Sequence, residues 1–291
     1  MKRCTERAFA KVNLSLDVLG RLPDGYHSME TVMQGIDLCD KVELSLREDG
    51  EISVWSNFRF LPCDQRNLAW RAARLLLDRA ERPLGVDIRL TKRIPVGAGL
   101  AGGSADAAAV LRGMNLLLGL GLSAPELEAL GRELGADVPF CVRGGTAVGR
   151  GRGDILTALP APPESTVLVC KPRFSISTPK LFARLDQGKR LRHPDTPGLL
   201  SALERGDLLE LSQRMYNVFE EVLPLSMARE IAAIKSVMLD CGALGAVMTG
   251  TGSAVIGLFA PGGTGEAARA RLEGQYACCA LSQMLPRLNV S

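Results

Sequence analysis

The chain has 291 residues, of which 46% are hydrophobic and 23% charged, and its formal net charge is +3. This length and apolar content suit one large domain or, more readily, two of moderate size, and they exclude an intrinsically disordered protein. The nearly balanced charge excludes a surface that gathers nucleic acid or anionic lipid through its overall field, so any anionic ligand must be held locally.

The start of the chain predicts no targeting segment. Its first residues, MKRCTERAFAK, have no apolar stretch behind the basic ones, and nowhere do eighteen apolar residues follow one another. We therefore expect a soluble, cytoplasmic protein that does not associate with membranes.

The first predicted element is a strand from Phe9 to Leu19, in which apolar and polar residues alternate. Such alternation is typical of a half-buried strand. The residues expected to face the core are Ala10, Val12, Leu14, Leu16 and Val18, and those expected on the other face are Lys11, Asn13, Ser15 and Asp17.

Residues 40–48 and 51–56 predict two strands that form a hairpin around Asp49-Gly50, a favoured turn pair. Asn67 is expected to cap a helix over 68–80, and residues 86–94 are expected to form a strand that leads into a glycine-rich loop. Apolar residues at helical spacing after that loop predict a helix that ends at Gly119, followed by a second helix over 125–134.

The proline-rich segment 158–165 has no periodicity and predicts a boundary between domains 1–163 and 164–291. Beyond it we expect a strand over 166–172 and helices as far as residue 240. Two strands within 242–259 should flank a second turn of small residues, before a helix over 265–273 and a strand over 276–285. This order of elements predicts an α+β protein.

Neither cysteines nor histidines point to a metal centre. The eight cysteines form no C-x-x-C pair and stand in apolar contexts, which predicts reduced, buried thiols. The two histidines, His27 and His193, lie far apart in the sequence, so a zinc site is not expected.

The glycine-rich loop, PVGAGLAGGSA over 95–105, contains four glycines directly before a predicted helix. Without Cβ atoms the backbone N–H groups can approach an anion closely, and the start of the helix adds its positive dipole end. The loop is therefore a candidate phosphate site.

Two common phosphate motifs fit this loop poorly. Residues 97–102 match the dinucleotide-binding pattern G-x-G-x-x-G, but the next predicted element is a second helix where that fold requires a parallel strand. Gly97, Gly102 and Ser104 match three positions of a P-loop, but Gly103 stands where its lysine belongs. A turn that merely packs the helix on the strand remains an alternative.

The same residues resemble a known family. The pattern P-x-x-x-G-L-x-G-G-S-A is similar to the ATP-binding loop of the GHMP kinase superfamily. Residues 10–31, 135–154 and 248–259 are similar, in order and spacing, to its members that phosphorylate 4-diphosphocytidyl-2-C-methyl-D-erythritol in the non-mevalonate (MEP) route to isoprenoids. The resemblance implies MgATP-dependent phosphorylation of the 2-hydroxyl of that small molecule. It also implies two domains, an N-terminal one like ribosomal S5 domain 2 and a C-terminal ferredoxin-like one with extra helices.

Two residues would carry the chemistry. Asp137 precedes Val138-Pro139, where proline favours an extended residue before it, although the residues alone favour a helix N-cap for Asp137. Lys11 is the positively charged residue on the polar face of the first strand, where an ordinary solvated lysine is the alternative. The resemblance assigns proton acceptance to Asp137. Lys11 would then keep that carboxylate ionised and stabilise the developing alkoxide.

On the nucleotide side, the resemblance implies that Ser104 also lies near Mg²⁺. Ala105 stands where the family usually has a second serine, and Ala101 stands where it has glycine. Asp106, in the first turn of the predicted helix, is explained by the helix dipole. The residues implied to bind ATP are Pro95, Val96, Gly97, Ala98, Gly99, Leu100, Ala101, Gly102, Gly103, Ser104 and Ala105, with Lys92 and Asn67 as weaker candidates.

On the acceptor side, the resemblance implies that Tyr26 and Phe182 sandwich the cytosine and that His27 recognises its edge, because a neutral pyrimidine offers two π-faces and a polar edge. Asn13 and Thr178 would contact the erythritol or the diphosphate. A helix-core role for Phe182 and a turn role for His27 are the alternatives.

Other readings of the whole chain are a different small-molecule GHMP kinase and, outside the enzymes, an S5-like RNA-binding module. The aromatic content of 4% and the near-balanced charge disfavour RNA, and the basic run 189–193 is expected to be a solvated loop. The second small-residue loop, MTGTGS, would lie against the first or serve only as a tight turn. We expect a monomer or a weak homodimer.

Overall fold

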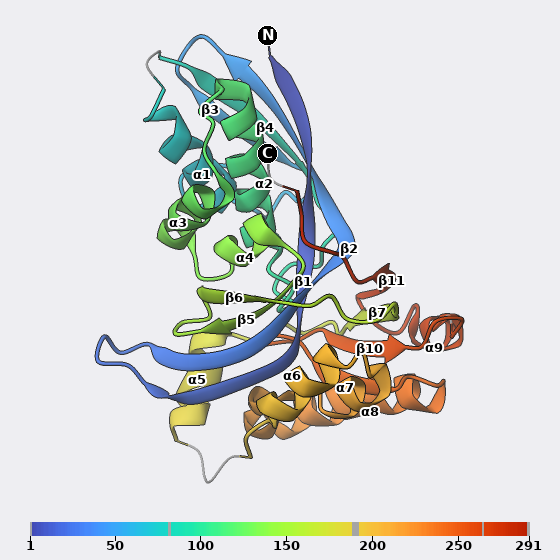
Figure 1. Cartoon of the computed structure of the whole chain (residues 1–291). Helices are drawn as coiled ribbons and strands as arrows, with labels where there is room; N and C mark the ends of the chain where they lie inside the picture. Colours follow the sequence, from blue (N-terminus) through green and yellow to red (C-terminus); the bar gives the residue numbers. More distant parts are fainter. Residues whose placement is uncertain (1, 81–82, 188–191, 264, 290–291) are drawn as a thin grey trace.

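A computed structural model describes residues 2–80, 83–187, 192–263 and 265–289. Within these ranges the chain forms two β-sheets with helices packed on them (Figure 1). The basic run predicted as a loop lies largely outside the described residues, so its conformation stays a prediction.

The first sheet has the order β3-β4-β2-β1-β8, with β5 paired to β2 and β6 to β5. Its strands are β1 (Arg3–Arg21), β2 (His27–Arg47), β3 (Ile52–Ser56), β4 (Gly85–Thr91), β5 (Thr146–Arg150), β6 (Ile155–Leu159) and β8 (Tyr216–Asn217). The helices on its covered face are α1 (Leu68–Leu77), α2 (Gly102–Leu118), α3 (Ala124–Leu134) and α4 (Val138–Arg143).

The second sheet is antiparallel throughout, in the order β11-β7-β10-β9. Its strands are β7 (Thr166–Lys171), β9 (Gly245–Met248), β10 (Val255–Phe259) and β11 (Cys278–Gln283). The remaining elements are α5 (Thr178–Asp186), α6 (Thr196–Glu204), α7 (Leu208–Gln213), the 3₁₀ helix η1 (Val218–Val222), α8 (Leu225–Asp240) and α9 (Glu266–Leu272).

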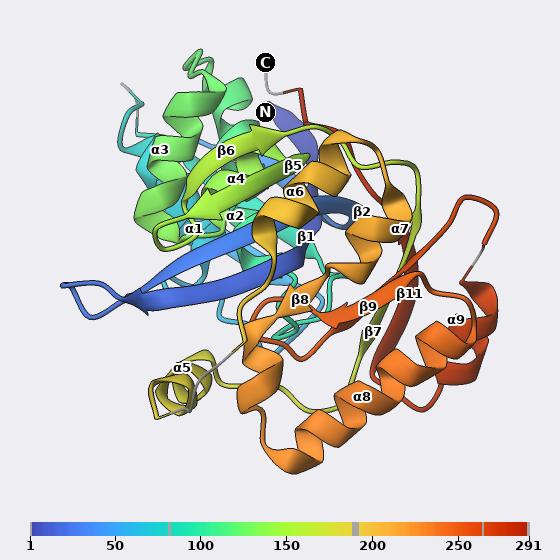
Figure 2. The same cartoon turned by 60° about the horizontal axis from the view of Figure 1, so that its bottom comes forward.

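The central strands of the second sheet, β7 and β10, are buried on both faces, which joins the two halves of the molecule. Along β7, Val167 and Val169 belong to the apolar core shared with α6, α7 and the first sheet, while Leu168 and Cys170 pack with α8 and α9. Figure 2 shows α6 and α7 on the side of the first sheet and α8 and α9 on the other. The predicted boundary at residue 163 falls between β6 and β7. It stays a prediction, because the first core continues across it.

The prediction of a half-buried first strand is wrong, because β1 is buried on both faces from Ala10 to Val18. Its polar face is covered by the second half of the chain. The Thr249 hydroxyl contacts the Asn13 side chain and His193 contacts Asp17, while β8 pairs with the strand edge at Ser15 and Leu16. Alternation in the sequence identified the strand correctly, but the partner that covers its polar face comes from a distant segment.

The expected hairpin around Asp49-Gly50 is also wrong. Strands exist on both sides of the turn, but β4 lies between them, antiparallel to β2 and parallel to β3. A local turn signal cannot reveal that a strand more than thirty residues later along the chain enters between its two neighbours.

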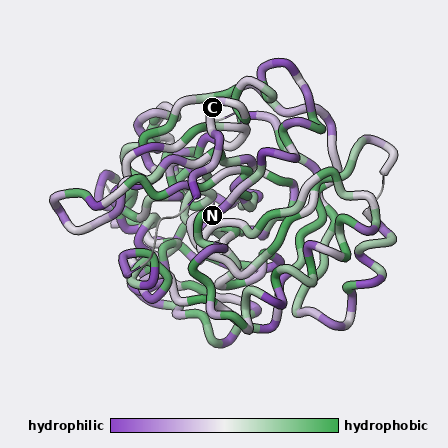
Figure 3. The backbone as a smooth tube through the Cα atoms, turned by 90° about the horizontal axis from the view of Figure 1, so that it is seen from below, coloured by the Kyte–Doolittle hydropathy of each residue, from purple (hydrophilic) through white to green (hydrophobic). Residues whose placement is uncertain are grey.

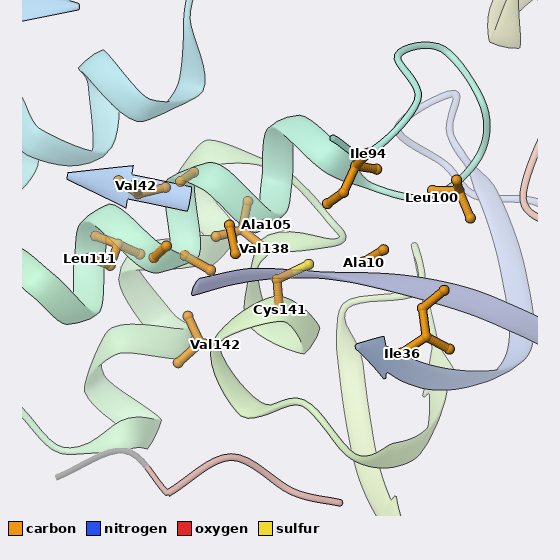
Figure 4. Packing of buried hydrophobic residues seen from close by; sticks show 14 of the residues in the cluster. Ala10, Ile36, Val42, Ile94, Leu100, Ala105, Leu111, Val138, Cys141 and Val142 are labelled. Atoms are coloured by element: carbon orange, nitrogen blue, oxygen red, sulfur yellow. The ribbon is translucent and has the colours of Figure 1, made fainter. Parts of the chain in front are cut away.

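The helix and loop signals hold at several other places. Asn67 caps α1 by accepting a hydrogen bond from the Ala69 N–H, and α2 ends at Gly119 in a left-handed conformation. The strands β9 and β10 flank the second small-residue loop as expected. Figure 4 shows the core that α2 and α4 form with β1, in which Ala105, Leu111 and Val138 belong to one apolar cluster.

All eight cysteines are free thiols, but the expectation that they are buried is wrong for most of them. Cys141 and Cys170 are buried, and Cys63 is exposed. Figure 3 shows hydrophilic and hydrophobic stretches interleaved along the chain, and among the residues described no helix is long and apolar enough to span a membrane.

The central position of β4 predicts a large cost for truncating its core residue Ile88, which is 1% exposed. Ile88→Ala should lower the free energy of unfolding by about 2–5 kcal/mol in urea denaturation, because it leaves a cavity in the core. Ile155→Ala is the matched control, since Ile155 is 62% exposed on β6 and should change stability by less than about 0.5 kcal/mol. Equal losses in the two variants would contradict the placement of β4.

Candidate active site

A cavity of about 400 Å³ opens beside the glycine-rich loop. Loop residues 95–104 form one wall, and the start of α1 with Asn67 forms another. Residues from the second half of the chain, Ile176, Thr178 and Thr251, close the remaining side. The predicted phosphate loop therefore lies where the two halves of the molecule meet.

The loop presents the start of α2 to this cavity. The N-cap residue, Ala101, has φ 56° and makes no side-chain capping bond, so the first N–H groups of the helix have no cap. Within the described ranges Ala101 is the one non-glycine residue with positive φ, which costs about 1 kcal/mol relative to glycine. Ala105 lies outside the cavity. Its N–H donates to the Ala101 carbonyl at 2.8 Å and its methyl group is buried in the core.

The second small-residue loop, residues 249–254, lies directly against the first, as expected. The Ala254 N–H donates to the Ala98 carbonyl at 3.1 Å. A Cβ on Gly99 would lie 2.1 Å from the carbonyl oxygen of Thr249, and Gly99 has φ +77°. Glycine at this position is therefore required by both the backbone conformation and the contact.

Lys92, a predicted ATP ligand, lies at the cavity wall between two buried carboxylates. Its Nζ donates to Asp40 and Asp106 and, at 3.3 Å, to the Gly102 carbonyl. Asp40 in turn accepts the backbone N–H of Ile94 at 2.8 Å. The charge of Lys92 is thus already balanced, and its contacts fix the start of α2 to the sheet.

Asp106 is a member of this buried cluster, a role that the helix dipole alone does not explain. Burial raises the pKa of its carboxyl to about 7, while Lys92 acts to lower the pKa and Asp40 to raise it. Its Oδ1 atom is buried without a hydrogen-bond partner among the residues that the structure describes.

Asn67 lines the cavity, but its side-chain amide is occupied. Its Oδ1 accepts from the Ala69 N–H at 2.9 Å and its Nδ2 donates to the Pro62 carbonyl at 2.8 Å. Asn67 therefore shapes the cavity wall by fixing the start of α1.

The predicted catalytic pair lies together. The Nζ atom of Lys11 is 3.8 Å from Oδ1 of Asp137, and the side chains are 5% and 41% exposed respectively. Lys11 also donates to Oδ1 of Asn13 at 2.8 Å. Neither residue lines the cavity, but the Lys11 N–H donates to the Leu100 carbonyl at 3.2 Å, so the pair lies beside the glycine loop.

The expected extended junction before Pro139 is wrong, because Val138–Arg143 forms α4 and proline is accepted in the first turn of a helix. Asp137 stands at the N-cap position with αR backbone angles, and its side chain makes no capping bond. The carboxylate is consequently left available to other groups.

The residues predicted for the acceptor fall into separate groups. The ring of His27 stacks on Phe182 with centroids 4.5 Å apart, and its Nε2 is 2.7 Å from Asp186, which sequence reasoning missed. This hydrogen bond holds the pKa of Asp186 below its usual value. Tyr26 is exposed, and the Arg152 guanidinium carbon lies 3.8 Å from its ring centroid.

Thr178, expected on the acceptor side, lines the cavity of the glycine loop and its hydroxyl is 2.8 Å from that of Thr251. Asn13 is buried and bonded within the protein. Asn217 was not anticipated. It donates to the carbonyls of Met248 and Gly250 at 2.7 and 2.8 Å, and no local pattern marks a lone asparagine as the residue that holds a loop.

The chain is similar to known kinases over most of its length. The family model for the GHMP kinases N terminal domain matches residues 67–145, and the model for GHMP kinases C terminal matches residues 199–278. The 4-diphosphocytidyl-2-C-methyl-D-erythritol kinase of Bacillus velezensis is 47% identical over 256 residues, which cover 88% of each chain. The enzyme of the same name from Brevibacillus brevis is 45% identical, over 88% of this chain and 87% of its own.

Solved structures with a similar fold also include kinases. A crystal structure of 4-(cytidine 5'-diphospho)-2C-methyl-D-erythritol kinase matches with a TM-score of 0.79 and 32% identity, over 97% of this chain and 99% of that one. Homoserine kinase from Cytophaga hutchinsonii matches with a TM-score of 0.78 and 20% identity, over 99% and 96% of the two chains, which indicates a shared fold only.

The contact between the two loops predicts that Gly99→Ala is more damaging than an equivalent change elsewhere. The matched control is Gly119→Ala, because Gly119 has φ +67° and no atom lies within 4 Å of an added Cβ. This variant should lose only about 1 kcal/mol of unfolding free energy, from the strain of a left-handed alanine. Gly99→Ala bears the same strain and must also displace the Thr249 carbonyl. Its loss of unfolding free energy in urea should therefore be clearly larger, and equal losses would contradict the contact.

The buried cluster predicts a second stability effect. Lys92→Met leaves two buried carboxylates without their cation and should lower the free energy of unfolding by about 3–5 kcal/mol. Lys41→Met, which breaks an exposed pair with Glu43, should cost less than about 1 kcal/mol.

The deficit of Lys92→Met should also grow as pH rises from about 5 to about 8. Burial already raises the pKa of Asp106 to about 7, and removal of Lys92, which acts to lower this pKa, raises it further. The folded variant therefore keeps the Asp106 proton over a pH range in which the unfolded chain has released it. Urea denaturation at both pH values measures this, and a deficit independent of pH would count against the cluster.

Proposed function

The chain belongs to the GHMP kinases, which are ATP-dependent kinases, and we propose that it transfers phosphate from ATP to the 2-hydroxyl of 4-diphosphocytidyl-2-C-methyl-D-erythritol in isoprenoid synthesis. The single observation that carries the proposal is the Lys11–Asp137 pair beside the glycine loop, to which the Lys11 main chain is hydrogen-bonded at Leu100. Support for the acceptor comes from relatives of 45–47% identity that are named for this substrate.

In the proposed reaction Asp137 accepts the proton of the attacking hydroxyl. Its side chain is 41% exposed, so a hydroxyl can reach it, and the ammonium of Lys11 lies 3.8 Å from its Oδ1. An alcohol is a very weak acid, so proton transfer accompanies phosphoryl transfer and does not precede it. Lys11 then stabilises the charge that develops on the attacking oxygen.

The phosphates of ATP would lie against the backbone N–H groups of the glycine loop and the positive end of α2. Lys92 contributes by fixing this helix start, because its own charge is taken up by Asp40 and Asp106. Asn67 likewise contributes to the shape of the wall. The negative charge of the triphosphate is therefore met by amides and by a cation that accompanies the nucleotide.

Mg²⁺ fits this arrangement as the accompanying cation. The hydroxyl of Ser104 lines the cavity, and the buried Oδ1 of Asp106 two residues later lacks a hydrogen-bond partner within the described ranges. Hydroxyl and carboxylate oxygens suit Mg²⁺, and the described residues contain no cluster of three acidic, cysteine or histidine ligands. Ser104 would hold the ion together with phosphate oxygens and water, and the ion would neutralise phosphate charge during transfer.

The cytosine would be taken up by Tyr26, His27 and Phe182. Stacking of a base on an aromatic ring contributes about 1–3 kcal/mol. The ring of His27 covers one face of Phe182. A base that stacks on this face of Phe182 would displace His27, which would then lie at the polar edge of the base. Thr178, whose hydroxyl lies at the cavity of the glycine loop, would contact the part of the acceptor nearest to the triphosphate.

The proposal includes a monomer or weak homodimer that acts in the cytoplasm on a small molecule, with neither nucleic acid nor membrane as partner. A different small-molecule GHMP kinase is the nearest alternative, and turnover of another alcohol would identify it.

The proposal predicts that ADP is released from MgATP in the presence of 4-diphosphocytidyl-2-C-methyl-D-erythritol and not with mevalonate or homoserine. Asp137→Asn should reduce this rate by about 10²-fold or more, a loss typical of removing a general base. Asp78→Asn, at the exposed end of α1, is the matched control and should leave the rate unchanged. Full activity of Asp137→Asn would remove Asp137 from the mechanism, and turnover of a control alcohol alone would exclude the proposed acceptor.

A further inference from the structure

We infer that Thr249, in the loop between β9 and β10, is a positioning residue that orients Lys11 through Asn13. The inference rests on the proposed function, because it concerns the same catalytic pair. Thr249 is fully buried and lies in the second sheet's loop, whereas Lys11 and Asn13 lie on β1 of the first sheet. The hydrogen bonds around Asn13 carry the argument.

The orientation of the Asn13 amide is set by Thr31. The Thr31 hydroxyl has one hydrogen, which it donates to the Ser15 carbonyl at 2.7 Å. It can therefore only accept from Asn13, whose Nδ2 lies 2.7 Å away. This assigns Nδ2 to the side of Thr31 and leaves Oδ1 of Asn13 as the acceptor for Lys11 Nζ at 2.8 Å.

Thr249 closes a ring of hydrogen bonds with the same residue. Its hydroxyl accepts the backbone N–H of Asn13 at 2.9 Å, and the nearest acceptor for its single hydrogen is Oδ1 of Asn13 at 3.1 Å. The Gly99 carbonyl, at 3.4 Å, is the competing acceptor. One hydroxyl thus touches the main chain and the side chain of the residue that holds Lys11, and also the phosphate loop.

The loop that carries Thr249 is itself held in place. Asn217 donates to the carbonyls on both sides of Thr249, and the Thr249 N–H donates to the Ala254 carbonyl at 2.9 Å. Without the Thr249 hydroxyl, the Asn13 N–H would be buried without a partner and Oδ1 would keep only Lys11. Asn13 would then be held by Thr31 and Lys11 alone, so its position, and with it the direction of Lys11 toward Asp137, would be less closely fixed.

The test compares Thr249→Val, which keeps the shape and removes the hydroxyl, with Thr249→Ser, which keeps the hydroxyl. Thr249→Val should lower kcat about tenfold, the effect of one hydrogen bond, and change both KM values by less than about threefold. Thr249→Ser should retain kcat within about twofold. Thr146→Val, which removes another buried hydroxyl, bonded to Gln34, is the matched control and should leave kcat unchanged.

A second readout needs no substrate. In protein labelled with ¹³C,¹⁵N-lysine, the side-chain NMR signal of Lys11, assigned with Lys11→Arg, should shift in Thr249→Val and stay in place in Thr249→Ser and Thr146→Val. If Thr249→Val does not fold, Thr249→Ala carries the same prediction.

The outcomes separate the two proposals. An unshifted Lys11 signal in a folded Thr249→Val variant overturns the inference, and so does an equal loss of kcat in Thr249→Ser. A wild-type protein without activity on the cytidyl substrate overturns the proposed function alone, because the NMR comparison still decides the role of Thr249.

Discussion

The close contact between the backbones of Gly99 and Thr249 is the constraint on which the site depends. It brings a loop of the first sheet and a loop of the second together at a distance that leaves no room for a side chain on Gly99. The strand β1 runs beside both loops, since the Lys11 N–H donates to the Leu100 carbonyl and the Asn13 N–H to Thr249. The phosphate loop and Lys11 are therefore fixed relative to each other by the joining of the two halves.

Two buried lysines of the site have different roles because their charges are balanced differently. Lys92 is held between Asp40 and Asp106 and has no charge to offer a ligand, so its contribution is to hold α2 in place. Lys11 has a neutral amide as its nearest partner and a half-exposed carboxylate at 3.8 Å, which leaves its charge available to a substrate. The sequence cannot distinguish them, because burial and pairing arise only in the folded chain.

Local signals in the sequence predicted the elements that they directly control. The cap at Asn67, the stop at Gly119, the glycine loop before α2 and the small-residue turn between β9 and β10 are all present. Contacts between distant segments could not be predicted. They place β4 between β2 and β3, bury the polar face of β1, and bring Asn217 into hydrogen bonds with the second loop. The proximity of Lys11 and Asp137 was predicted from the family resemblance alone, because the spacing of residues along the chain carries no information on a contact between such distant positions.

The central claim is that the glycine loop and the Lys11–Asp137 pair serve one transfer reaction. The most direct test is a crystal structure of the full chain with a non-hydrolysable MgATP analogue and 4-diphosphocytidyl-2-C-methyl-D-erythritol. The account predicts the triphosphate at the start of α2 and the acceptor's 2-hydroxyl within about 2.6–3.2 Å of the Asp137 carboxylate, in line with the γ-phosphate. A hydroxyl held away from Asp137, or a triphosphate bound outside the glycine loop, would contradict it.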